Sequence, residues 1–147
     1  MPIRELCALK VEQVHKSEYI KIADAKTKAG CRQVPVHSKL KTALARMVKD
    51  SKDGFVLSGL TANKYGDRSN AVGKRFGRLK TALGFGPSHV YHSIRRTVAT
   101  LLENAGVPEN VSADILGHDK PTMTYGLYSG GASLATKRDA IEKLRYA

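Results

Sequence analysis

Cysteine, histidine and long hydrophobic runs are scarce in this sequence, and tryptophan is absent. Cys7 and Cys31 lie far apart and form neither a CxxC pair nor a zinc-binding spacing, which excludes a disulfide framework and is typical of reduced thiols in a cytoplasmic protein. No stretch approaches the roughly 18 apolar residues of a membrane-spanning helix, and no signal peptide is recognisable. The histidines form no HExxH motif or carboxylate cluster, so we expect no metal and no cofactor.

Negative charge is scarce as well. The 147 residues hold 13 Asp and Glu against 25 Lys and Arg, which gives a formal net charge of +12. Such a charge attracts polyanions, so the composition predicts a nucleic acid as partner. Hydrophobic residues make up 41% and charged residues 26%, which are ordinary values for a globular protein. We therefore expect one domain over residues 1–147 that folds without disulfides or a structural metal.

The first third of the chain predicts a helix followed by a β-hairpin. Apolar residues at helical spacing favour a helix over residues 2–14. Residues 18–24 alternate polar and apolar side chains, and residues 32–36 form a second extended run, so we predict two antiparallel strands. Residues 27–30 are expected to form the turn between them, with Gly30 available for a positive φ. The proline in the second run limits that strand to an edge or an end of the sheet.

The remaining two thirds predict mainly helices. They are expected over residues 38–48 (capped by Ser38), 69–83, 88 or 89 to 106, 108 or 109 to 117, and from 133 onward. In the third of these, the residues expected to face the core are Ile94, Val98, Leu101 and Leu102. Residues 55–57 are a short apolar run that we expect to be buried. The sequence therefore predicts an α+β fold, mainly α-helical, with a small antiparallel β-hairpin or sheet near the N-terminus.

The last third of the chain gathers residues that suit phosphate chemistry. His92 and Arg95 are three residues apart, a spacing that places both on one face of a helix. His118 follows a Leu-Gly pair, and Tyr125 and Tyr128 come shortly afterwards. Arginine and histidine donors can hold a phosphodiester while a phenolic oxygen attacks it. Each histidine alone is more often a capping or helix-face residue, so only their joint placement indicates a site.

Several motifs in one order along the chain carry a family resemblance. They are RELCAL at residues 4–9, TKAGCRQVPV at 27–36, HSIRRT at 92–97, LGH at 116–118 and a tyrosine shortly afterwards. Over nearly its whole length the chain resembles the catalytic domain of the tyrosine recombinases, or phage integrases. The resemblance implies site-specific DNA recombination or integration, for a phage or another mobile element. In that family a DNA strand is cleaved and rejoined through a 3′-phosphotyrosine bond, without ATP or a metal.

The resemblance also implies catalytic roles. Arg95 would clamp the scissile phosphate with its fixed positive charge, and His92 would donate to the phosphate or manage the proton of the nucleophile. Lys28, on the hairpin, would protonate the departing 5′ oxygen. His118 would hydrogen-bond the scissile phosphate. Tyr128 would be the nucleophile.

The choice between two tyrosines rests on the local sequence. The commonest family spacing places the nucleophile about nine residues after the second histidine, whereas Tyr125 is seven and Tyr128 is ten residues after His118. The Tyr-Gly-Leu-Tyr-Ser form is similar to a family branch in which the second aromatic residue attacks. We therefore expect Tyr128 to be the nucleophile and Tyr125 to be a packing residue.

Further basic residues are expected to contact the DNA backbone. They are Arg32, Lys74, Arg75, Arg78 and Lys80. A run of charges on a helix is more often only a solvated face, but the net charge favours phosphate contact. Arg32 fits a strand end or a phosphate contact better than a catalytic role.

The chain departs from the family near its start. The family has an active-site arginine three residues before the glutamate of its Glu-Leu pair, and this chain has Pro2 there, while Arg4 points well off the expected direction. We expect the family's N-terminal DNA-clamping domain to be missing from this chain as well. We therefore expect a fragment that lacks the first part of the catalytic domain and is inactive if the missing arginine is essential. Alone it should be a monomer, and the full-length protein should form a homotetramer on DNA.

Two other functions remain open. A type IB topoisomerase shares the same chemistry but relaxes DNA, and the lack of a long insertion before the tyrosine favours a recombinase. A non-catalytic DNA-binding remnant or regulator of the same fold would keep the positive charge without the cleavage. Charge alone does not separate these functions.

Overall fold

The structure is a computed structural model that describes residues 1–147 except 24, 26, 121–123, 125–129, 146–147 and the side chain of residue 28. It is mainly helical with a small antiparallel sheet near the N-terminus, so the predicted fold class is confirmed. The α-helices are α1 (Ile3–Cys7), α2 (Ser38–Asp50), α3 (Asn70–Ala82), α4 (Tyr91–Asn104), α5 (Glu109–Leu116) and α6 (Leu134–Glu142). Among the described residues, no helix is long and apolar enough to cross a membrane.

Three short strands form the sheet in the order β1-β2-β3. They are β1 (Val14–His15), β2 (Tyr19–Ile22) and β3 (Arg32–Pro35), and both pairs are antiparallel. Tyr19 lies opposite Pro35, which is the last residue of an edge strand. The prediction that this proline lies at an edge or an end of the sheet is confirmed. Proline has no N–H and therefore cannot donate a hydrogen bond to a strand on its other side.

The backbone between β2 and β3 differs from the predicted hairpin turn. A 3₁₀ helix, η2 (Lys28–Gly30), occupies part of it, and Gly30 is not among the glycines with positive φ. A Cβ at Gly30 would lie 2.5 Å from the Cβ of Ala25. Glycine is therefore explained here by close packing and not by a left-handed conformation.

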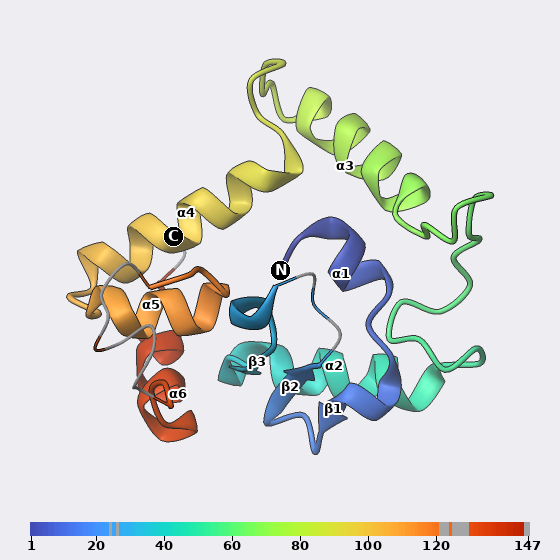
Figure 1. The fold of residues 1–147 in the computed structure, drawn as a ribbon. Coiled ribbons are helices and arrows are strands. Elements are labelled where there is room, and N and C mark those ends of the chain that lie inside the picture. The colour runs from blue at the N-terminus through green and yellow to red at the C-terminus, as the bar shows by residue number, and fades with distance from the viewer. Residues whose placement is uncertain (24, 26, 121–123, 125–129, 146–147) are drawn as a thin grey trace.

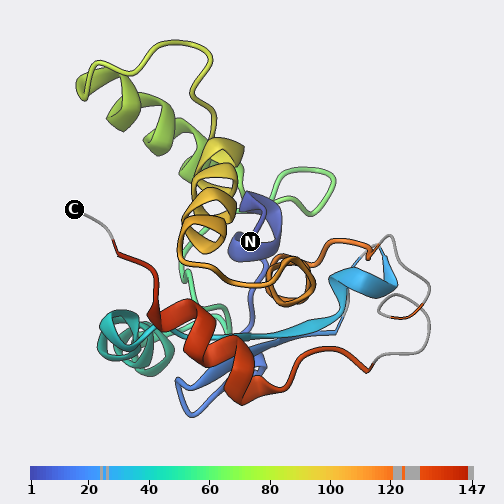
Figure 2. The same cartoon turned by 90° about the vertical axis from the view of Figure 1, so that its left-hand side faces the viewer.

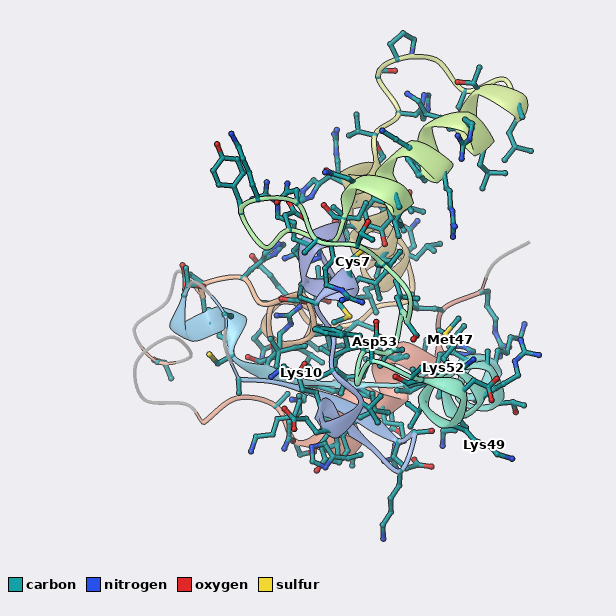
Figure 3. All side chains as sticks on the ribbon, turned by 90° about the vertical axis from the view of Figure 1, so that its right-hand side faces the viewer. Cys7, Lys10, Met47, Lys49, Lys52 and Asp53 are labelled. Carbon is teal, nitrogen blue, oxygen red and sulfur yellow. The ribbon has the colours of Figure 1, made fainter. Side chains whose placement is uncertain are left out.

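The N-terminal helix is much shorter than predicted. Residues 2–14 were expected to be helical throughout, but α1 ends at Cys7 and a 3₁₀ helix, η1 (Val11–Gln13), follows. Between them the chain pairs with the segment after α2, because the Val56 N–H donates to the Leu9 carbonyl at 2.9 Å. This pairing buries Leu9 and Val56 together, and tertiary packing outweighs the helical pattern. Figure 3 places Cys7, which is fully buried, inside the molecule.

Two hydrophobic clusters form the core. One lies between the sheet, α2 and the segment around Leu9, and it also contains Ile22 and Val56. The other joins the C-terminal half of α4 to α5 and α6, with Leu102 and Ile115 among its buried residues. The edge strand β3 packs against both α5 and α6, so it lies at the junction of the two clusters (Figures 1 and 2).

The helix α2 begins at the predicted residue with a different cap. The ring Nδ1 of His37, and not the hydroxyl of Ser38, accepts the Lys39 N–H at 3.1 Å. Ser38 instead donates from its backbone N–H and its hydroxyl to the carboxylate of Glu142, both at 2.7 Å. This contact ties the start of α2 to the end of α6, and it lowers the pKa of the Glu142 carboxyl through the hydrogen bonds from Ser38.

The helix α3 contacts α1 at one end, and its other end and the loop that leads to α4 extend away from the sheet, α5 and α6 (Figures 1 and 2). The residues of α4 that pack on the core are Val98, Leu101 and Leu102, as predicted. Ile94 was also expected to face the core, but it is 48% exposed. That prediction was wrong, because α5 and α6 cover only the C-terminal half of α4.

The turn between β1 and β2 offers a stability test. Both central residues, Lys16 and Ser17, have positive φ (49° and 55°), and the Glu18 N–H donates to the His15 carbonyl at 2.9 Å. A left-handed conformation costs a non-glycine residue about 1 kcal/mol or more. We expect Ser17→Gly to raise the free energy of unfolding by about 0.5–1 kcal/mol, after the entropy cost of glycine, measured by urea denaturation. A decrease in stability would contradict the assigned turn.

Candidate active site

The first turns of α4 carry the predicted pair of histidine and arginine. The Val90 N–H donates to the Ser93 hydroxyl at 3.1 Å and caps the start of the helix. From this position His92 is exposed, and Arg95, three residues later, is partly buried. The predicted helical spacing is confirmed, so both side chains leave the helix from the same face.

Arg95 joins α4 to the end of α5. Its Nη2 donates to the carbonyl of Leu116, the last residue of α5, at 2.6 Å. Burial, and secondarily the positive charge of Arg32, lowers the pKa of Arg95, while Glu5 opposes that shift. Arg95 is thus held in place by one hydrogen bond, and it lies in the electrostatic environment of Arg32 and Glu5.

The turn after α5 brings His118 to the same place. Gly117 ends α5 with φ of 75°, a left-handed conformation that glycine adopts at little cost. The His118 N–H donates to the Ala113 carbonyl at 3.0 Å, and its side chain is exposed. Neighbouring groups still remove some water from the ring, and this desolvation is the largest cause that lowers the pKa of His118. The positive charges of Arg95, Arg32 and His92 lower it further. The imidazole is therefore largely neutral at pH 7 and can donate one N–H to a phosphate.

Beneath these residues lies a buried ion pair. Arg32 of β3 donates from Nη2 to Oε1 of Glu5 at 2.9 Å and from Nη1 to Oε2 at 3.3 Å. The Arg32 Nε also donates to the Ile115 carbonyl at 3.0 Å. The predicted DNA contact of Arg32 stays a prediction, and Nε, Nη1 and Nη2 of this side chain each donate to a protein acceptor. Sequence reasoning missed the role of Glu5 in this pair, although the glutamate belongs to one of the family motifs.

Three of the predicted catalytic residues lie together, and two cannot be placed. His92, Arg95 and His118 meet where the start of α4 approaches the end of α5. The backbone of Lys28 belongs to η2, which lies beside the end of α5 in Figures 1 and 2, while its side chain lies outside the described residues. Tyr128 and Tyr125 also lie outside the described residues. Their roles therefore stay predictions.

The structure locates the position where the family's first arginine is expected. Pro2 immediately precedes α1 and takes an extended conformation, with φ of −61° and ψ of 152°. The neighbouring Arg4 forms an ion pair from its Nε to Oδ2 of Asp67 at 2.7 Å, in the loop before α3. Arg4 thus contacts the loop before α3.

The basic helix α3 presents three of the predicted DNA contacts to solvent. Lys74, Arg75 and Arg78 are exposed. Lys80 is different, because its ammonium donates to the carbonyl of His89 at 2.7 Å and of Gly86 at 3.1 Å and so holds the loop before α4. The predicted helix over residues 69–83 is confirmed within one residue at each end, while DNA contact by these side chains stays a prediction.

Sequence reasoning also missed one carboxylate next to the site. Oδ1 of Asp114 on α5 forms an ion pair with the Lys120 ammonium at 2.6 Å, and Oδ2 accepts the Ala132 N–H at 2.7 Å. Lys120 and Ala132 lie before and after the chain segment that carries the predicted nucleophile. The sequence offered one signal for this role, which is an acidic residue between two apolar residues, Ala113 and Ile115. Both of these neighbours are buried in the structure.

Comparisons with known proteins show what this chain is similar to. Residues 1–132 match the profile described as "Phage integrase family". A solved structure of the Tn1549 transposon integrase (residues 82–397), in complex with circular intermediate DNA, is similar over 99% of this chain, with 26% sequence identity and a TM-score of 0.62. The chain spans 56% of the length of that integrase chain. A search of curated proteins found no match. The match over most of the chain shows that it belongs to the phage integrase family.

Proposed function

We propose that residues 1–147 form the catalytic domain of a site-specific tyrosine recombinase without its first part. The domain cleaves one strand of a DNA duplex through attack by Tyr128 and passes that strand to a partner strand. The observation that carries this proposal is the meeting of His92, Arg95 and His118 at the junction of α4 and α5, in a chain of this family. Three donors at one place suit a phosphate, whose charge grows in the transition state.

The reaction conserves the phosphodiester bond. The phenolic oxygen of Tyr128 attacks the scissile phosphorus and loses its proton, the bond to the 5′ oxygen breaks, and a 3′-phosphotyrosine bond forms. Lys28 supplies the proton that the departing 5′ oxygen needs. Attack by a 5′ hydroxyl on the phosphotyrosine reverses these steps and joins the strand, so no outside source of energy is required.

Arg95 stabilises the extra negative charge during both steps. One of its N–H groups is bound to the Leu116 carbonyl at 2.6 Å, so the guanidinium is fixed before DNA arrives. A donor that is already in place needs no reorganisation when charge develops, which makes it effective in the transition state. His92, from the same face of α4, donates to the phosphate or receives the tyrosine proton.

His118 acts as a neutral donor. The charges of Arg95, Arg32 and His92, together with burial, lower the pKa of its ring and thus favour the uncharged form at neutral pH. A neutral imidazole that donates to the phosphate still has an acceptor nitrogen on its other side. We propose that His118 binds a non-bridging oxygen of the scissile phosphate.

The exposed cations of α3 bind the DNA backbone in this proposal. The similar Tn1549 transposon integrase structure is a DNA complex, which supports DNA as the partner of this chain. Each phosphate contact releases counterions, so binding by Lys74, Arg75 and Arg78 must depend on salt. In the full-length protein we propose a homotetramer on DNA, with a separate N-terminal clamping domain.

The salt dependence of DNA affinity tests the role of α3. Replacing Lys74, Arg75 and Arg78 together by Gln should reduce the slope of log affinity against log salt by about 0.9 for each phosphate that the variant no longer neutralises, up to about 2.7 for three. Fluorescence anisotropy with a duplex over a range of salt concentrations measures this slope. The matched control replaces three exposed cations in and after α2, Arg46, Lys49 and Lys52 (the last two are labelled in Figure 3), by Gln. An equal decrease of slope in both triple variants would contradict a specific role of α3.

A suicide substrate tests the proposed function itself. Its nicked strand releases a short 5′-hydroxyl fragment after cleavage, so the covalent intermediate cannot be rejoined and accumulates on a denaturing gel. Formation of an adduct followed by joining to an added 5′-hydroxyl strand is expected of a recombinase. DNA binding without any adduct would favour a non-catalytic remnant or regulator, and relaxation of supercoiled plasmid without strand exchange would favour a topoisomerase.

A further inference from the structure

Arg32 is a deeply buried cation next to the site, with only 6% of its side chain exposed. Besides its two bonds to Glu5 of α1 and its bond to the Ile115 carbonyl of α5, its Nη1 donates to the Gly30 carbonyl of η2 at 2.6 Å. One guanidinium on β3 thus contacts α1, η2 and α5 at once. These bonds use four of the five N–H donors that an arginine has.

This geometry argues against a phosphate contact by Arg32. A guanidinium that binds a phosphate in the usual forked manner must present two free parallel N–H donors, and here that fork faces Glu5. Releasing it would leave the Glu5 carboxylate, whose side chain is 21% exposed, without its ion-pair partner. The contacts therefore indicate a role inside the protein.

The last turn of α5 receives a hydrogen bond from each of two arginines. The final carbonyls of a helix have no partner within the helix, and here Arg32 binds the carbonyl of Ile115 while Arg95 binds that of Leu116. Gly117 follows directly. A Cβ at Gly117 would lie 2.9 Å from Nη1 and 3.0 Å from Cζ of Arg32, so the arginine packs closely against the turn that leads to His118.

We propose that Arg32 is a positioning residue of this active site. It fixes the last turn of α5, and hence His118, and it fixes η2, and hence the backbone that carries Lys28, against Glu5 of α1. The inference rests on the proposed function, in which His118 and Lys28 act on the phosphate held by Arg95. Arg32 itself touches neither the phosphate nor the nucleophile.

The test compares Arg32→Met and Arg32→Lys with a matched control, Arg68→Met. Arg68 is also largely buried and binds a carboxylate and a carbonyl, those of Asp53 and Leu57, but these partners lie in the loop after α2. At saturating suicide substrate, Arg32→Met should form the covalent adduct about 100-fold more slowly, the effect of misplacing catalytic groups by about 1 Å. Its DNA affinity and the salt dependence of that affinity should stay unchanged. Arg32→Lys should recover part of the rate, and Arg68→Met should keep it.

A second readout does not depend on cleavage. Among the described residues, the charged or titratable groups that act on His118 are Arg95, Arg32, His92 and Asp119. Removing the positive charge of Arg32 should therefore raise the pKa of the His118 ring. A histidine NMR titration of the free chain should show this increase in Arg32→Met, a smaller one in Arg32→Lys and none in Arg68→Met.

The outcomes separate this inference from the proposed function. If the wild-type chain forms no adduct, the proposed function fails. The His118 titration then still shows whether Arg32 lies next to His118. If Arg32→Met loses no more rate than Arg68→Met and leaves the His118 titration unchanged, the inference is overturned. A lower DNA affinity with a reduced salt slope would also overturn it, because Arg32 would then be a phosphate contact. If Arg32→Met does not fold, the same comparisons with the milder Arg32→Lys decide.

Discussion

Tyr128→Phe is expected to form no detectable covalent adduct with a suicide substrate while it binds DNA as tightly as the wild-type chain. The substitution removes only the phenolic oxygen, which is the atom that attacks the phosphorus, and keeps the size and shape of the ring. Loss of a nucleophile leaves only the transition-state stabilisation of the remaining groups, so we expect the adduct rate to fall by at least about 10⁴-fold. Denaturing gels follow the adduct, and fluorescence anisotropy follows the affinity.

Tyr125→Phe is the matched control for this experiment. It removes the same atom from the neighbouring tyrosine, and it should keep most of the adduct rate because Tyr125 is expected to be a packing residue. The reverse pattern, in which Tyr125→Phe forms no adduct and Tyr128→Phe still does, would show that the assignment of the nucleophile is wrong. Equal loss of affinity and cleavage in Tyr128→Phe would indicate a structural role.

Arg95→Gln is expected to slow adduct formation by about 10²–10³-fold at saturating DNA, the usual cost of removing one preorganised donor. The variant loses the positive charge that faces the phosphate and also the hydrogen bond from Nη2 to the Leu116 carbonyl. Arg95→Lys should recover only part of the rate, because lysine keeps the charge but cannot reproduce the forked geometry of a guanidinium. Single-turnover measurements with the suicide substrate separate this rate from DNA binding.

Arg96→Gln is the control for Arg95, since Arg96 is the next residue of α4 and is exposed. It should change the adduct rate little. Urea denaturation of Arg95→Gln reports the structural part of its effect, which we expect to be about 1.5–3 kcal/mol for one charge-assisted hydrogen bond. A large loss of stability together with an unchanged rate per folded molecule would contradict the catalytic role of Arg95.

Two helix ends in the last third of the chain could be predicted from local signals in the sequence. Gly117 was expected to end α5, and it does so with a left-handed backbone. Ser133 was expected to open the last helix, and its hydroxyl accepts the Thr136 N–H at 3.1 Å. Such signals are local, because the capping residue and its partner lie within four residues of each other. Pro35 at the end of an edge strand was predictable for the same reason.

The failures come from contacts between segments that are distant in the sequence. The expected long first helix gives way after Cys7, because Leu9 pairs with Val56. Ile94 fits the apolar stripe of α4, but no described helix covers it, and it stays exposed. Periodicity within one segment contains no information on which other segments cover it.

The residues of the candidate site also fall into those that local sequence could predict and those that it could not. The spacing of His92 and Arg95 and the Leu-Gly pair before His118 could be read from the sequence, because each lies within one element or one turn. The partners of Arg32 could not, because its bonds reach residues as far away as Ile115. A basic residue at the start of a strand looks the same in the sequence whether it faces a phosphate or a buried carboxylate. Only the fold distinguishes these two roles.

Peptide mapping of the trapped adduct decides whether this chain cleaves DNA as proposed. The wild-type chain is incubated with the suicide substrate, digested with a protease and a nuclease, and analysed by mass spectrometry. We predict one modified peptide, with a nucleotide 3′-phosphate linked to the phenolic oxygen of Tyr128. A chain that binds the substrate but carries no such modification, or carries it on another residue, would contradict the proposed mechanism.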